Sequence, residues 1–128
     1  MGERNTISRE GRRFSYPMAA GVTIYAGNVV VMQSGAAKEG LVATGLVAVG
    51  IAEATVVNSG AAGASMIDAV AGTYRLDNDA VDPVGLTDIG NDCYLTGPAS
   101  VAKTNGTGTR SRAGRVRAVD ADGVWVTI

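Results

Sequence analysis

The stretch GRVRAVDADGVWVTI (residues 114–128) decides the fold class. Two runs rich in β-branched residues flank Asp120–Gly123, a sequence typical of a turn. In the second run, alternation places Val124 and Val126 on one face and Trp125 on the other. The stretch therefore predicts a β-hairpin with one buried and one exposed face.

The same signals recur toward the N-terminus, where short apolar or alternating runs are separated by Gly, Asn, Asp and Pro. The runs expected as strands are VTIY at 22–25, VVVM at 29–32, LVAVGIAEATVV at 46–57, MIDAV at 66–70, TYRL at 73–76 and DCYLT at 92–96. Together with the C-terminal hairpin and short edge segments they make about nine or ten strands, with almost no helix. This pattern predicts an all-β fold, a small antiparallel β-barrel or a jelly-roll-like sandwich.

The connections are also predicted from turn residues. We expect a hairpin in which 66–70 and 73–76 pair across Ala71-Gly72, and a loop over 34–40. One helical turn is expected at 87–89, capped by Thr87. The polar segment 103–114 is expected to be an exposed loop.

The composition of the 128-residue chain favours a single domain with a core of small side chains. Hydrophobic residues make up 46% of the chain but aromatic residues only 5%, so alanine and valine supply most of the apolar volume. The 18 glycines and the charged fraction of 18% suit a turn-rich β protein, part of whose surface is covered by another chain. We expect an extended N-terminal arm over 1–18 and a β domain over 19–128.

The N-terminal segment is basic, whereas the rest of the chain is acidic. Within 1–16, four arginines (Arg4, Arg9, Arg12, Arg13) face two glutamates, giving +2; the remaining seven basic and ten acidic residues give −3. A nucleic-acid arm, a targeting signal and a strap over a protein partner are all compatible with such a segment. It lacks the apolar run of a signal peptide, and its glutamates argue against a transit peptide, so we expect the protein to be cytosolic when made.

The residues that usually carry catalysis or bind metals are sparse. The chain has no histidine, which excludes histidine-dependent triads and histidine-ligated metals, and its one cysteine, Cys93, is expected to be a buried apolar residue. Asp77, Asp79 and Asp82 depart from the calcium-loop spacing and are expected to cap turns rather than to bind a metal. We therefore predict no enzyme activity and no cofactor.

A second basic cluster precedes the C-terminal hairpin. Arg110, Arg112, Arg115 and Arg117 lie close in sequence to Trp125, a combination that would also suit a binder of single-stranded nucleic acid. The alternative is a solvated strand face with Arg117 near Trp125 or an acidic neighbour. The second interpretation is favoured, because the folded body lacks a basic stripe.

Four segments, read in order, resemble a family of phage and prophage capsid cement or head decoration proteins. They are NTISREGRRFSYPMAAGVTIYAGNVVVM, VAVGIAEATVVNSGAAGAS, AGTYRLDNDAVDPVGLTDIGNDCYL and TRSRAGRVRAVDADGVWVTI, which together cover nearly the whole chain. The resemblance implies a β-barrel or jelly-roll-like virion protein on the outer face of an icosahedral head. During assembly the protein would be in the host cytoplasm. It also implies that the protein bridges major capsid subunits.

With this resemblance, a basic arm on an acidic body is expected to lie across neighbouring subunits and meet carboxylates. Its capsid-binding residues would be Arg4, Arg9, Arg12, Arg13, Phe14 and Tyr16, with the two aromatic residues as anchors. The body is expected to fold without the arm and to associate into dimers or trimers. The alternative function is a tail, baseplate or receptor-binding module of similar fold. Neither function requires a membrane, and nucleic acid is not an expected partner.

Overall fold

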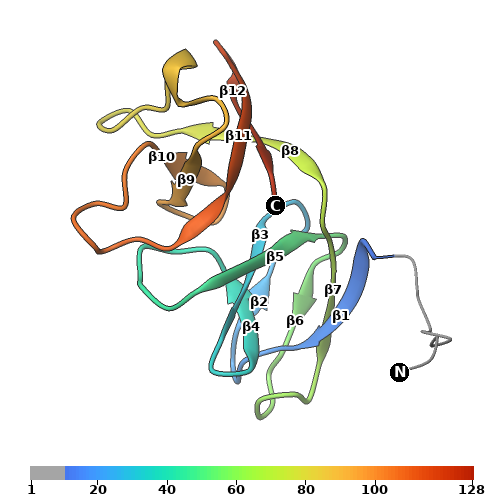
Figure 1. Ribbon diagram of the computed structural model, residues 1–128. Coiled ribbons are helices and arrows are strands. Elements are labelled where there is room, and N and C mark those ends of the chain that lie inside the picture. Colours follow the sequence, from blue (N-terminus) through green and yellow to red (C-terminus); the bar gives the residue numbers. More distant parts are fainter. Residues whose placement is uncertain (1–10) are drawn as a thin grey trace, which may run out of the picture.

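The computed structural model describes residues 11–128, and the fold is all-β (Figure 1). The elements in this part of the chain are β1 (Arg13–Pro17), β2 (Thr23–Ile24), β3 (Val29–Gln33), β4 (Ala36–Glu39), β5 (Val47–Ala52), β6 (Val56–Val57), β7 (Met66–Val70), β8 (Thr73–Asn78), the 3-10 turn η1 (Leu86–Asp88), β9 (Asp92–Leu95), β10 (Ser100–Ala102), β11 (Arg112–Asp120) and β12 (Gly123–Thr127). The all-β prediction is confirmed, and the strands in the described residues are more numerous than expected.

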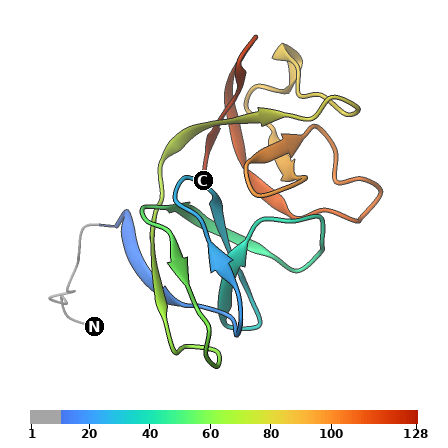
Figure 2. The ribbon, with the colours of Figure 1, turned by 180° about the vertical axis from the view of Figure 1, so that it is seen from behind.

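The strands form two halves that follow one another along the chain (Figure 1, Figure 2). The N-terminal half holds a five-stranded sheet in the order β1-β7-β5-β3-β4 and the two-stranded sheet β2-β6. The two outer strands of the larger sheet, β1 and β4, come together at a bridge between Met18, which follows β1, and Ala37 of β4. The C-terminal half is a closed barrel in the order β10-β8-β12-β11-β9, with only the β10–β8 pair parallel. The predicted barrel is therefore found in the C-terminal half.

Strand β3 links the cores of the two halves. Val29 and Val31 pack with the side chains inside the C-terminal barrel, whereas Val30 packs within the N-terminal half. All three are fully buried. A strand buried on both faces needs a continuous apolar run instead of alternation, which is what the sequence VVVM provides. Both cores consist mainly of Val, Ala, Leu and Ile, as the composition predicted.

The C-terminal hairpin has the predicted arrangement. Strands β11 and β12 pair antiparallel from Arg115↔Thr127 to Asp120↔Gly123. Val124 and Val126 are fully buried, while Trp125 lies on the outer face with 37% of its surface exposed. Gly114 allows the close approach of the last strand, because a Cβ at this position would lie 2.2 Å from the Thr127 carbonyl oxygen.

The predicted hairpin of 66–70 and 73–76 is wrong. Strand β7 pairs with β1 and β5 in the N-terminal half, whereas β8 pairs with β12 and β10 in the barrel. Ala71-Gly72 is therefore the crossover between the halves, held by bonds from the Ala71 amide to the Arg12 carbonyl (2.7 Å) and from the Ile128 amide to the Gly72 carbonyl (2.9 Å). Both segments are strands as expected, but tertiary partners outcompete the local pairing.

Two other connections differ from the prediction. The expected loop over 34–40 contains β4, which forms a hairpin with β3. Ser34 and Gly35 both have positive φ, the geometry of a tight two-residue turn whose twist matches the flanking strands. The expected strand over 46–57 is divided into β5 and β6, which belong to different sheets. The helical turn is present as η1, but the Asp88 carboxylate, not Thr87, accepts the Gly85 amide.

The boundary of the predicted arm also differs, because residues 13–17 form β1. This strand pairs with β7 over its whole length, from Arg13↔Val70 to Pro17↔Met66. Phe14 and Tyr16 are half-buried whereas Arg13 and Ser15 are exposed, so the segment has the alternation of an amphipathic strand. Met18, inside the expected arm, is fully buried. Arg4 and Arg9 lie outside the described residues, and for that segment the arm stays a prediction.

Candidate functional site

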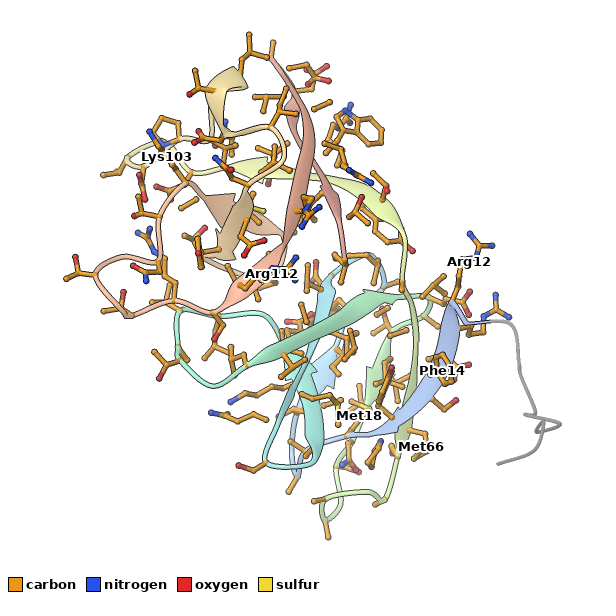
Figure 3. The ribbon with its side chains drawn as sticks, viewed as in Figure 1. Arg12, Phe14, Met18, Met66, Lys103 and Arg112 are labelled. Atoms are coloured by element: carbon orange, nitrogen blue, oxygen red, sulfur yellow. The ribbon has the colours of Figure 1, made fainter. Side chains whose placement is uncertain are left out.

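Strand β1 positions the described members of the predicted capsid-binding set. Arg12 and Arg13 are exposed, and Figure 3 shows Arg12 at the start of the strand, pointing away from the body of the protein. Tyr16 packs against the apolar core of the N-terminal half. The strand therefore brings the arginines to the surface and packs Tyr16 partly against the protein's own core, and the role of Tyr16 as an anchor stays a prediction.

The exposed side chains of β1 are tied to acidic residues. Arg13 forms an ion pair with Glu53, which follows β5, and the Ser15 hydroxyl donates to the Asp68 carboxylate on β7. Both partners lie on the β7 side of the strand, so Arg13 and Ser15 lean over the sheet. Sequence reasoning missed these pairs, because Arg13 and Glu53 are 40 residues apart.

The outer edge of β1 has no full-length partner strand in the described residues. Bonds from the Ala71 amide to Arg12 and from the Met18 amide to Ser65 show that the even-numbered residues direct their backbone groups toward β7. By the alternation of an antiparallel pair, the backbone groups of Arg13, Ser15 and Pro17 point the other way. Within residues 11–128, β4 meets β1 on that side only at its C-terminal end, through the bridge between Met18 and Ala37 and the bond from the Ala19 amide to the Ala37 carbonyl (2.9 Å).

The 103–111 loop is anchored by one carboxylate. Asp82 accepts bonds from the Thr104 hydroxyl (2.6 Å), the Thr104 amide (3.1 Å) and Arg110 Nη1 (2.9 Å). These bonds, those from Thr104 foremost, lower the pKa of Asp82 below its usual value. Asp79 caps the preceding turn by accepting the amides of Val81 and Asp82, as predicted. The three aspartates form no group that could hold a metal ion in the described chain.

The remaining arginines of the second cluster lie on the outer face of β11. Arg112 is paired with Asp92 at 2.8 Å, and Arg117 donates to the Thr127 hydroxyl at 3.2 Å. Arg110 and Arg112 are therefore engaged with carboxylates, which agrees with the prediction of a solvated face and weakens the case for a nucleic-acid ladder.

Trp125 lies beside Arg117. A β-bulge lies between Val116 and Ala118, and such an insertion leaves Arg117 and Ala118 together opposite Trp125. The indole nitrogen donates to Asp120 at 3.1 Å, while Arg75 of β8 lies directly across from Trp125. Bonds from the Asp122 amide and from Trp125 lower the pKa of Asp120. The sequence pointed to Arg117 and Trp125, but Arg75 was not expected.

A shallow depression of about 610 Å³ lies beside this face. It is lined by polar residues that include Tyr94, Lys103, Asn105 and Arg115. Lys103 and Arg115 are both exposed and give the rim two positive charges. Asp88 and Asp92 also line the depression and balance these two charges, so the lining has no net charge and favours neither an anion nor a cation.

Cys93 points into the barrel core and is fully buried, as predicted. Burial raises the pKa of its thiol to about 12, so the thiolate is not populated near neutral pH. The side chain acts as a small apolar residue in the core.

Comparisons with protein-family models, curated proteins and solved structures give no match for this chain. No helix in the described residues is long and apolar enough to span a membrane.

Proposed function

We propose that the chain is a structural, non-enzymatic virion protein, a capsid cement that binds the outer surface of a phage head and bridges major capsid subunits. The resemblance of the four sequence segments to cement and decoration proteins suggests this role. The observation that carries it is the position of β1: this strand brings Arg12 and Arg13 to the surface at the outer margin of the fold. These residues continue the basic segment that contains Arg4 and Arg9.

The chemistry of this surface fits a protein partner. Basic side chains on an acidic body attract carboxylates and orient the approach of an acidic surface. Arg4, Arg9 and Arg12 are the proposed contacts, with Arg13 shared between Glu53 and the partner and Phe14 half-buried beside them. Capsid subunits and neighbouring copies of the chain are the proposed partners.

Binding to heads that lack the protein tests this function. A ligand that binds only the intact shell stabilises it by mass action, so adding purified protein is expected to raise the melting temperature of the heads. Replacing Arg4, Arg9 and Arg12 together by alanine is expected to weaken this effect. Arg112→Ala is the control, because it removes an exposed arginine from the opposite half of the fold. Absence of binding by the wild-type protein would refute the proposal.

The alternative is a tail, baseplate or receptor-binding module, for which the depression beside Lys103 and Arg115 is the relevant feature. Such a module uses a concave polar site to hold a host surface group. The virion would carry only a small number of copies of it. Lys103→Ala and Arg115→Ala would then impair attachment to host cells without changing the stability of the head.

A further inference from the structure

The outer face of β8, β12 and β11 carries the only tryptophan of the chain. Trp125 lies directly across from Arg75 of β8, and the bulge in β11 sets Arg117 on its other side. Arg117 also points outward, because it donates to the hydroxyl of Thr127 on the same face. Arg75, Trp125 and Arg117 therefore form one row across the sheet, and we refer to them as the tryptophan row.

The next row toward the hairpin turn is acidic. Gly123 pairs with Asp120 of β11, and the pairing of Val124 with Leu76 sets Asp77 of β8 on its other side. Both carboxylates are exposed, and alternation along each strand places them on the same face as the tryptophan row. We refer to Asp77, Gly123 and Asp120 as the turn row. Figure 1 and Figure 2 show this turn at the end of the molecule away from the N-terminal half.

The charges of these two rows are weakly satisfied within the described residues. Arg75 comes no closer than 4.0 Å to a carboxylate, that of Asp122, and Arg117 is bonded to the neutral Thr127 hydroxyl. The Asp77 carboxylate forms no hydrogen bond or ion pair within residues 11–128. By contrast, three arginines elsewhere in this part of the chain have a carboxylate within 2.9 Å: Arg13, Arg110 and Arg112.

We infer that two copies of the chain associate face to face through this surface, about a two-fold axis that runs across the strands at Val124. Such an axis reverses the strand direction of the second copy but keeps each strand over its counterpart. The turn row of one copy then lies over the tryptophan row of the other. Arg75 faces Asp77 of the second copy, and Arg117 faces Asp120 of the second copy. The face is thus complementary to itself, as a two-fold interface requires.

The apolar part of the face fits the same arrangement. Trp125 lies over Gly123 of the second copy, where the absence of a side chain leaves room for the indole ring. Two packed sheet faces are about 10 Å apart, a spacing that tryptophan and arginine side chains fill. These two residue types also contribute most of the binding energy in many protein interfaces.

A third contact lies farther along β11. Arg115 is exposed beside Thr127, two residues from the turn-distal side of Trp125. The axis at Val124 brings the hairpin turn of the second copy over this position. Asp122 of the second copy, whose side chain is 77% exposed, then approaches Arg115.

Other face-to-face arrangements place like charges together. A two-fold axis at Trp125 would set Arg75 against Arg75 and Arg117 against Arg117. An axis parallel to β12 would set Arg75 against Arg117 and Asp77 against Asp120. Like charges in direct apposition are destabilising, so the axis at Val124 is favoured.

The mixed charge of the face also favours a second copy over a nucleic acid. The carboxylates of the turn row would repel a phosphate backbone, whereas the second copy presents arginines to them. The inference gives a structural form to the self-association included in the proposed function, but it does not require the virion role. A contact of three strands buries little surface, so the dimer is expected to be weak and to depend on protein concentration.

Charge exchange tests the pairing of Arg75 with Asp77. Arg75→Glu places a negative charge against Asp77 of the second copy, and Asp77→Lys places a positive charge against Arg75. Each variant alone is expected to weaken the dimer about tenfold or more, because two attractive contacts become repulsive. In an equimolar mixture the new glutamate of one variant faces the new lysine of the other, and the native Asp77 faces the native Arg75. The mixture is therefore expected to dimerise.

Sedimentation equilibrium of the purified full chain measures this association separately from head binding. The wild-type chain and the mixture are expected to approach twice the monomer mass of 12.9 kDa as concentration rises. Arg112→Ala is the control, because Arg112 is already paired with Asp92 and lies outside the contact. Circular dichroism checks that each variant is folded. A wild-type chain that stays monomeric, or a mixture of folded variants no more associated than its components, would overturn the inference.

The emission of Trp125 locates the contact, because it is the only tryptophan and is 37% exposed. Its emission is expected to shift to shorter wavelength as the wild-type chain associates, and Arg75→Glu is expected to show no shift at the same concentrations. A monomeric chain whose emission responds to oligodeoxythymidylate would show that the face binds single-stranded nucleic acid. A monomeric chain whose binding to phage heads is weakened by Arg75→Glu would show that the face takes a capsid subunit. Either result contradicts the dimer.

Discussion

At the scale of single residues, Asp82 shows how one carboxylate orders a long loop. It joins the turn after β8 to Thr104 and Arg110, the two ends of the 103–110 segment. The sequence predicted an exposed loop over 103–114, of which residues 112–114 instead belong to β11. It placed Asp82 in a turn, but it did not indicate the contact across 28 residues. Asp79 was predicted correctly because its capping bonds are local, whereas the Asp82 network depends on how the barrel closes.

Acidification tests the role of Asp82. Its pKa is lower in the folded protein than in the unfolded chain, so its contribution to stability is present above the usual aspartate range and is lost as pH falls through the folded-state pKa. Asp82→Asn is expected to lower the melting temperature at about pH 7, and the difference from the wild type is expected to shrink on acidification to about pH 2, because the wild-type carboxylate progressively gains its proton.

The control for this measurement is Asp77→Asn, which changes an exposed carboxylate in the same segment. Its effect on the melting temperature is expected to be small at both pH values. An Asp82→Asn variant as stable as the wild type near neutral pH would show that the Thr104 and Arg110 bonds do not hold the loop.

At the scale of elements, β1 shows that part of the predicted N-terminal arm is a strand of the folded domain. Its RFSYP sequence alternates exposed and half-buried side chains, a period-two signal that was available in the sequence. The segment was interpreted as an arm because its charge dominated its short apolar pattern. The hairpin of β11 and β12 was predicted correctly because its turn and both strands are adjacent. The partners of β7 and β8 were predicted wrongly, because alternation identifies a strand but not the strand with which it pairs.

Two truncations test the assignment of β1. Deletion of residues 1–10 is expected to leave the melting temperature almost unchanged. Deletion of residues 1–18 removes β1 and the fully buried Met18, so we expect a loss of about 3 kcal/mol or more in the free energy of unfolding. Denaturant unfolding followed by circular dichroism measures both.

Tyr16→Ala is the intermediate case, because it keeps the strand and removes one half-buried ring from the core of the N-terminal half. A chain lacking residues 1–18 that unfolds at the wild-type denaturant concentration would mean that β1 contributes nothing to the fold and that the segment is an arm after all.

At the scale of the whole molecule, the two halves are joined through β3 and the β7–β8 crossover. Val29 and Val31 enter one core and Val30 the other, so displacement of β3 disturbs both. The sequence predicted the fold class and one barrel, since alternation and turns are local signals. The division into two halves was not predicted, because it depends on which strands pair across the crossover.

This architecture is compatible with the proposed role in binding partners. Arg12 and Arg13 are exposed at one margin of the fold, and Trp125 with Arg75 and Arg117 forms an exposed face on the barrel. Tryptophan and arginine are the residues most often responsible for binding energy in protein interfaces. The face around Trp125 therefore has the composition typical of a protein interface.

Imaging of intact virus particles that incorporate the chain tests the central claim most directly. Cryo-electron microscopy of such particles, with the density fitted by the two-half fold, locates every copy. The capsid-cement account predicts many copies in a regular array over the outer surface of the head, with the basic N-terminal segment toward the major capsid subunits. A few copies confined to the tail or to one vertex, or particles without the protein, would contradict it.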